Sequence, residues 1–114
     1  MTTLGMLGPI ELKADNIDNL INAKSPGNFA LGHIEGKAFI VKYISRSDRN
    51  LNSQLKTYIG RYPNFKWSYA SSVKAAYDKA CQNYHDFGGS DALDNKNHPE
   101  KPEGEYLICE ICGM

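Results

Sequence analysis

Residues 28–45 read Asn-Phe-Ala-Leu-Gly-His-Ile-Glu-Gly-Lys-Ala-Phe-Ile-Val-Lys-Tyr-Ile-Ser, and this stretch decides the fold. Two runs rich in aromatic and aliphatic residues, 29–34 and 38–44, are separated by Glu35-Gly36-Lys37. Such runs around a glycine indicate a β-hairpin, because glycine accepts the positive φ that a tight turn requires. We therefore predict two antiparallel strands here.

The chain after the hairpin predicts a helix, a third strand and a second helix. Leu51, Leu55 and Ile59 recur every four residues, which predicts a helix over residues 50–59 with one apolar face. Residues 65–70 alternate aromatic and polar side chains, as a strand with one buried face does, and Trp67 is expected in the core. Ser71 or Ser72 is the expected N-cap of a helix that runs to about residue 86.

The two ends of the chain differ from this core. In residues 1–24, Asp15 is the expected N-cap of a short helix. Residues 88–105 are polar and rich in turn formers. The expected architecture is α+β: a small mixed or antiparallel three-stranded sheet flanked by helices. It forms a single domain, 1–114, with an N-terminal helical extension (1–24), a core (25–87) and an irregular C-terminal arm (88–114).

The composition is that of an ordinary globular domain, with 41% hydrophobic and 23% charged residues in a chain of 114. No apolar run approaches the roughly 18 residues that cross a bilayer, so no membrane partner is expected. The first residues lack the pattern of a signal peptide. We therefore expect a cytoplasmic protein.

The charges are unevenly distributed although the formal net charge is zero. Residues 42–66 contain six basic residues and one acid, whereas residues 78–114 contain eight acids and three lysines. The basic segment is either a face that binds DNA phosphates or a segment attracted to the acidic end. The candidate phosphate ligands are Arg46, Arg49, Lys56 and Arg61. The aromatic residues Tyr58, Tyr62, Phe65, Trp67 and Tyr69 are candidates for stacking on bases.

The cysteines and histidines predict a structural zinc site. Cys81 and His85 stand four residues apart on one face of a predicted helix, and Cys109 and Cys112 form a Cys-x-x-Cys knuckle. Three cysteine thiolates and one histidine imidazole are a ligand set that suits tetrahedral zinc. His98 is a competing ligand. The alternative is that Cys81 is simply a core residue. The odd number of cysteines argues against a framework of disulfides.

The order of elements and several short motifs resemble the GIY-YIG nuclease superfamily over residues 27–98. Gly27-Asn28-Phe29 stands where the family has Gly-Ile-Tyr, and Tyr43-Ile44-Ser45 stands where it has Tyr-Ile-Gly. Asn95 resembles an asparagine near the end of the family's domain. The stretches 45–48, 84–87 and 94–99 are also similar to those of a small group of bacterial proteins of this type.

The resemblance implies phosphodiester hydrolysis assisted by a divalent metal, with a tyrosine, an arginine on the first helix and a glutamate on a later helix. Tyr43 is retained, but Phe29, Gln54 and Ala80 occupy the expected tyrosine, arginine and glutamate positions. Either these losses are natural or Ala80 is a replacement that disables a nuclease.

The resemblance and its departures therefore imply a catalytically degenerate domain that binds DNA or a protein partner. The alternatives are an active endonuclease that uses Mg²⁺ or Mn²⁺ with a rearranged carboxylate, and a zinc-stabilised protein-interaction domain.

Overall fold

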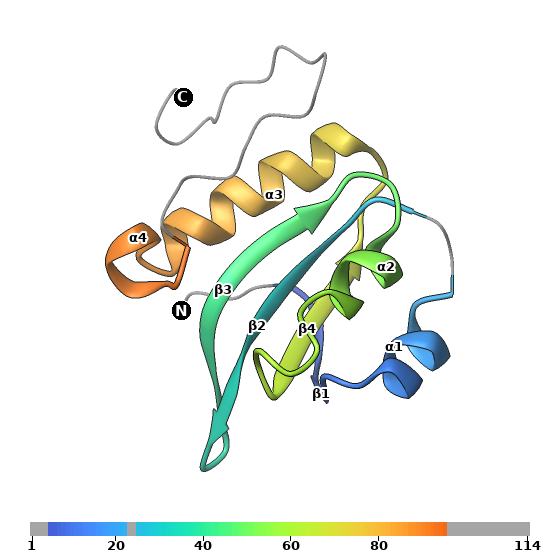
Figure 1. Ribbon diagram of the computed structural model, residues 1–114. Coiled ribbons are helices and arrows are strands. Elements are labelled where there is room, and N and C mark those ends of the chain that lie inside the picture. Colours follow the sequence, from blue (N-terminus) through green and yellow to red (C-terminus); the bar gives the residue numbers. More distant parts are fainter. Residues whose placement is uncertain (1–4, 23–24, 96–114) are drawn as a thin grey trace.

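The computed structural model describes residues 5–22 and 25–95 as a small α+β domain. Its elements are β1 (Leu7–Glu11), α1 (Ala14–Leu20), β2 (Gly27–Glu35), β3 (Ala38–Ser47), α2 (Leu51–Lys56), β4 (Asn64–Tyr69), α3 (Val73–Asp86) and α4 (Gly89–Ala92). The strands form one antiparallel sheet in the order β1-β4-β2-β3 (Figure 1). The α+β prediction is confirmed, with four strands instead of the three expected.

The central strand β2 is covered on both faces. Its residues 27–32 are all buried. Phe29 and Leu31 pack with Leu51 and Leu55 on the face covered by α1 and α2, here called the α2 face. Ala30 packs with Tyr84 on the opposite face, here called the α3 face. Figure 1 shows α3 on the other side of the sheet from α1 and α2. Side chains that alternate along a strand are thereby divided between two separate cores.

The hairpin between β2 and β3 confirms the first prediction. Glu35 pairs with Ala38, and Gly36 in the turn has a φ of +60°. The pairing shifts by one residue between Leu31 and Gly32, so that Lys42 is the extra residue of a bulge. A Cβ atom at Gly32 would overlap the carbonyl oxygen of Ile40, so this position accepts only glycine without a shift of the backbone.

The two predicted helices after the hairpin are present, although the first is shorter than expected. Asn50 caps α2 by accepting a hydrogen bond from the Ser53 amide. The amides of Thr57 and Tyr58 bond to carbonyls three residues back, which tightens the chain and ends the helix. Ile59 therefore misses the buried face and is 40% exposed. Ser72 caps α3 through the Ala75 amide, as predicted. None of the helices within residues 5–22 and 25–95 is long and apolar enough to cross a membrane.

The segment expected to be a helical extension contributes a strand to the sheet. β1 pairs with β4, and all of its residues except Ile10 are exposed, so its sequence lacks the alternation that predicts a strand. The helix expected next is present, but Asp15 lies in its first turn and Lys13 occupies the N-cap position. The short helix α4 was also missed in the segment expected to be irregular.

The outer edge of β3 is closed by the end of the described chain. The side-chain amide of Asn95 accepts a hydrogen bond from the Ile44 N–H at 2.8 Å and donates one to the Ile44 carbonyl at 2.7 Å. The Asp94 amide donates to the Lys42 carbonyl. We call residues 93–95 the edge clamp. It satisfies backbone groups that would otherwise face solvent on an edge strand.

Replacing Gly32 by alanine should destabilise the fold by more than about 2 kcal/mol, because the new methyl group would meet a backbone oxygen. The matched control is Gly36→Asn, since nothing lies within 4 Å of a Cβ at that position and asparagine tolerates positive φ. It should cost less than about 1 kcal/mol. Chemical denaturation measures the free energy of unfolding of both variants. A similar loss of stability in both would show that the close contact between Gly32 and the Ile40 carbonyl does not explain the need for glycine.

Candidate functional site

Three tyrosines gather on the α2 face and form the most distinctive side-chain cluster in the described residues. Tyr43 comes from β3, and Tyr58 and Tyr62 come from the link between α2 and β4. The Tyr43 ring lies 5.4 Å from the Tyr58 ring and 6.3 Å from the Tyr62 ring, measured between centroids. All three are half-buried against the core. We call them the tyrosine cluster.

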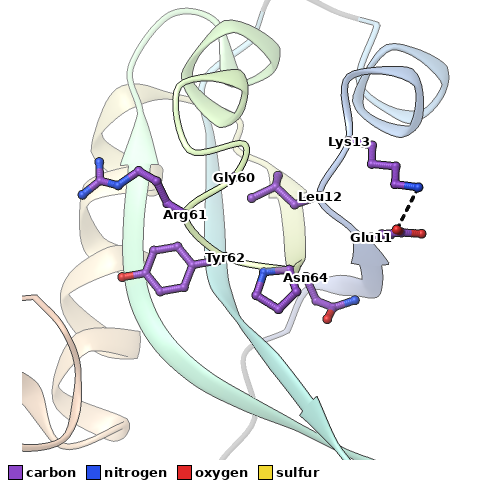
Figure 2. A pocket seen from close by; sticks show the side chains of 8 residues that line it. Glu11, Leu12, Lys13, Gly60, Arg61, Tyr62 and Asn64 are labelled. Atoms are coloured by element: carbon purple, nitrogen blue, oxygen red, sulfur yellow. Dashed lines mark ion pairs between the residues drawn. The ribbon is translucent and has the colours of Figure 1, made fainter.

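Arg61 brings a positive charge to this cluster. Its guanidinium carbon lies 5.3 Å from the centroid of the Tyr58 ring, within the range of a cation–π interaction. The residue is exposed, and no carboxylate in residues 5–22 or 25–95 forms an ion pair with it. In Figure 2 the side chains of Arg61 and Tyr62 leave the link on the same side, away from Glu11 and Lys13. Its charge is therefore available to a ligand.

The hydroxyl groups of Tyr43 and Tyr62 are held as neutral hydrogen-bonding groups. The Tyr58 hydroxyl donates to that of Tyr43 at 3.4 Å, and the Tyr62 hydroxyl donates to the Asp94 carboxylate at 2.8 Å. Burial, and then the Tyr58 hydrogen bond, raise the pKa of Tyr43 to about 12. Burial, and then Asp94, raise the pKa of Tyr62 to about 12. At neutral pH neither hydroxyl is a base.

A shallow hollow borders the cluster. It has a volume of about 580 Å³ and opens between the β1–α1 link and the residues that precede β4. Figure 2 shows Arg61 and Tyr62 on one side and the Glu11–Lys13 ion pair, 2.9 Å long, on the other. Its volume falls within the roughly 300–1,000 Å³ that is usual for sites of small ligands.

The positions that correspond to family catalytic residues do not meet at one point. Phe29 contacts Tyr58, with ring centroids 5.5 Å apart, and Gln54 belongs to α2, so both lie on the same face as Tyr43. Ala80 is buried on α3, one helical turn from both Ala76 and Tyr84, and α3 covers the other face. A carboxylate at residue 80 would therefore be separated from the Tyr43 hydroxyl by the sheet. Tyr43 and Gln54 therefore do not share a pocket with Ala80 in the described structure.

The predicted phosphate ligands are divided between the two faces. Arg46 lies on the α3 face, where its guanidinium is over the Tyr77 ring and its side chain is only 9% exposed. It pairs with Asp48 at 2.8 Å. Lys56 pairs with Asp18 at 2.6 Å. Arg49 and Arg61 are exposed. Arg46 is therefore separated from Arg61 by the sheet and Lys56 forms an ion pair, and the binding of DNA phosphates by these four residues stays a prediction.

The zinc prediction falls mostly outside the described residues. Cys81 is buried beside Tyr77 on α3, and His85 follows it one turn later. Cys109, Cys112 and the competing ligand His98 lie outside the ranges described. Within those ranges no three candidate ligands are grouped as a metal site would require. The zinc site stays a prediction.

Two residues of the site were not predicted as functional groups. Asp94 carries the only carboxylate that the described structure shows bonded to the tyrosine cluster, and Asn95 anchors the segment that places it there. The sequence does contain a signal for part of this site: Tyr58, Arg61 and Tyr62 all lie in the short link between α2 and β4, so they were bound to be close together. Asp94 is distant in sequence from all of them, and only the edge clamp brings it close.

Comparison of the chain with protein-family models, curated proteins and solved structures finds no match. The function is therefore inferred from the residues of the site and their surroundings.

Alkaline titration should detect Tyr43 and Tyr62 as late-ionising tyrosines. Because the pKa values of Tyr43 and Tyr62 are about 12, both should ionise about two pH units above an ordinary tyrosine. A pKa raised in the folded state adds stability that is present below pH 10 and is lost as the pH rises toward 12. Absorbance of tyrosinate measures the titration. The variant Tyr43→Phe should lose one late-titrating group; an unchanged late phase would contradict the assignment.

Protein purified without chelators should contain about one equivalent of zinc, if Cys81, His85, Cys109 and Cys112 bind it as thiolates and imidazole. Elemental analysis measures the content. The variant Cys112→Ser should lose the metal. Well under half an equivalent in the unaltered protein would rule the site out.

Proposed function

We propose that this chain is a non-cleaving DNA-binding module with a core organised like that of the GIY-YIG nucleases. The observation that carries the proposal is the exposed Arg61 guanidinium placed over Tyr58 in the tyrosine cluster. A cation combined with aromatic rings is a combination that nucleic-acid sites use for phosphate and base together. The order of the elements and the position of Tyr43 support the likeness to the family, whereas the position of Ala80 departs from it.

Binding at this site would draw on a small number of charges. Arg61 would provide one phosphate contact at the cluster, and Arg49, which is exposed between β3 and α2, would provide a second to the same DNA. The Tyr58 and Tyr62 hydroxyls already donate to Tyr43 and Asp94, so these two tyrosines offer DNA their rings rather than hydrogen-bond donors. Asp94 adds a negative charge beside Tyr62. We therefore expect weak binding whose dependence on salt corresponds to about two phosphate contacts.

The site lacks the side chains that usually catalyse hydrolysis of a DNA strand. Phosphodiester cleavage needs an activated water and a group that stabilises the charge on phosphate. Tyr43 stays protonated, Gln54 carries no charge, and Ala80 lies on the other face. Introducing Gln54→Arg together with Ala80→Glu would place the new cation and the new carboxylate on opposite sides of the sheet. That double variant should not gain nuclease activity.

Asp94 is the one observation that favours a second candidate, the active endonuclease with a rearranged carboxylate. It lies against Tyr62, whose ring neighbours Tyr43, and a carboxylate is a ligand that Mg²⁺ and Mn²⁺ prefer. Nicking of supercoiled plasmid with either metal decides between the two functions. We expect no nicking above background. Nicking that disappears in the Asp94→Asn variant would establish the second candidate instead.

The binding proposal is tested by the salt dependence of DNA affinity. Fluorescence anisotropy at several salt concentrations should give a log–log slope of about −1.8 for duplex DNA, from about −0.9 per contact. Arg61→Ala should reduce the magnitude of that slope by about 0.9. The control Lys37→Ala, in the hairpin turn, should change neither affinity nor slope.

Arg46→Ala is the contrasting variant, because Arg46 is buried in an ion pair. It should lower stability and leave the slope unchanged, since its loss leaves Asp48 unpaired. Absence of binding to both duplex and single-stranded DNA at low salt would refute the DNA-binding function and favour the protein-interaction alternative.

A further inference from the structure

We infer that the DNA bound at the tyrosine cluster is single-stranded, with unpaired bases stacked on the cluster and Arg61 on the backbone phosphate. This inference rests on the proposed function and names the form of its ligand. It depends on three features of the described residues: how few cations are free, how the tyrosine rings are placed, and where Asp94 lies.

The free cations are too few and too scattered to follow a duplex. Affinity for double-stranded DNA comes largely from several phosphate contacts on a continuous basic surface. Here Arg46 is buried on the α3 face, and Lys56 is held in an ion pair with Asp18. Lys66 lies 5.6 Å from the Phe39 ring, which packs on the α3 face. The basic segment 42–66 therefore does not become one basic surface in the fold.

The aromatic groups, in contrast, are concentrated. The rings of Tyr58 and Tyr62 lie within 6.3 Å of the Tyr43 ring, and they are tilted against it by 43° and 37°. Sequence-independent sites for single strands combine such rings with a nearby arginine, because every base presents a π face once it is unpaired. In a duplex these faces are stacked inside the helix and are not accessible.

Asp94 also favours a base over a second phosphate. Its carboxylate is exposed and accepts the Tyr62 hydroxyl at 2.8 Å, so a phosphate next to Tyr62 would meet a like charge. A base is neutral, and the amino groups of several bases can donate to a carboxylate. The arrangement thus separates a phosphate position at Arg61 from a base position at Tyr62.

The test compares two probes on the unaltered full chain. One is a fluorescent single strand of about twelve nucleotides that contains adenine and cytosine and cannot pair with itself, and the other is a hairpin duplex of about the same length of paired DNA. Anisotropy at low salt should show the single strand bound at least about tenfold more tightly, which corresponds to about 1.4 kcal/mol. Its slope with salt should be no steeper than about −1.4, from about −0.7 per contact.

Three variants separate stacking from charge. Tyr62→Leu should weaken binding of the single strand about tenfold without changing the slope, because it removes a ring and no charge. Tyr62→Trp should keep the affinity. Tyr69→Leu is the matched control: Tyr69 was a candidate for stacking from the sequence, but the fold places this exposed tyrosine at the far end of β4 from the cluster, so its loss should leave binding unchanged. Thermal unfolding followed by circular dichroism checks that each variant is folded.

The outcomes distinguish the inference from the function on which it rests. Duplex bound as tightly as the single strand, or a Tyr62→Leu variant that binds normally, would overturn the single-strand inference and leave the DNA-binding function intact. Failure of both probes to bind at low salt would overturn both.

Discussion

The structure depends on the burial of β2 on both of its faces. An internal strand can satisfy its backbone by pairing with β3 and β4, but its side chains need a cover above and below the sheet. The helices α1 and α2 supply one cover and α3 supplies the other. This constraint assigns each side chain of the neighbouring strands to one face of the sheet or the other, and so decides which functional groups can meet. Tyr43, opposite Leu31, joins the α2 face, and Arg46, opposite Asn28, joins the α3 face.

The polar layer on the α3 face illustrates how much of the charge in this chain serves stability. The Asn28 side chain is fully buried and donates to the Ala76 carbonyl at 2.8 Å, which ties the sheet to α3. The Arg46 guanidinium stacks on the Tyr77 ring and forms an ion pair with Asp48. A buried guanidinium is tolerated only with such partners, and removal of either partner is costly. These residues fall in the stretches that resemble family motifs, yet their contacts are those of structural residues.

The elements that could be predicted from the sequence are those in which buried and exposed side chains alternate with a regular period. The hairpin, β4 and α3 combine apolar periodicity with turn or cap residues, and each was found close to its observed bounds. β1 was missed because it is almost wholly exposed and exists through its pairing with β4. For the site, Tyr43 and Arg61 were named, but Arg46 was placed beside them. Residues 43 and 46 are separated by an odd number of positions on one strand, so alternation alone puts them on opposite faces. The contribution of Asp94 could not be predicted, since it follows from a tertiary contact with β3.

The edge clamp has a consequence for how the molecule meets other chains. Without Asp94 and Asn95, the polar backbone groups of Lys42 and Ile44 would point into solvent along the rim of the sheet. A rim of this kind is a template on which a foreign strand can add, and uncontrolled addition leads to aggregation. The carboxamide of one asparagine makes both hydrogen bonds that a residue of such a strand would make to Ile44. The Asn95 side chain thereby blocks the addition of a foreign strand at Ile44. The same clamp holds Asp94 within hydrogen-bonding distance of Tyr62.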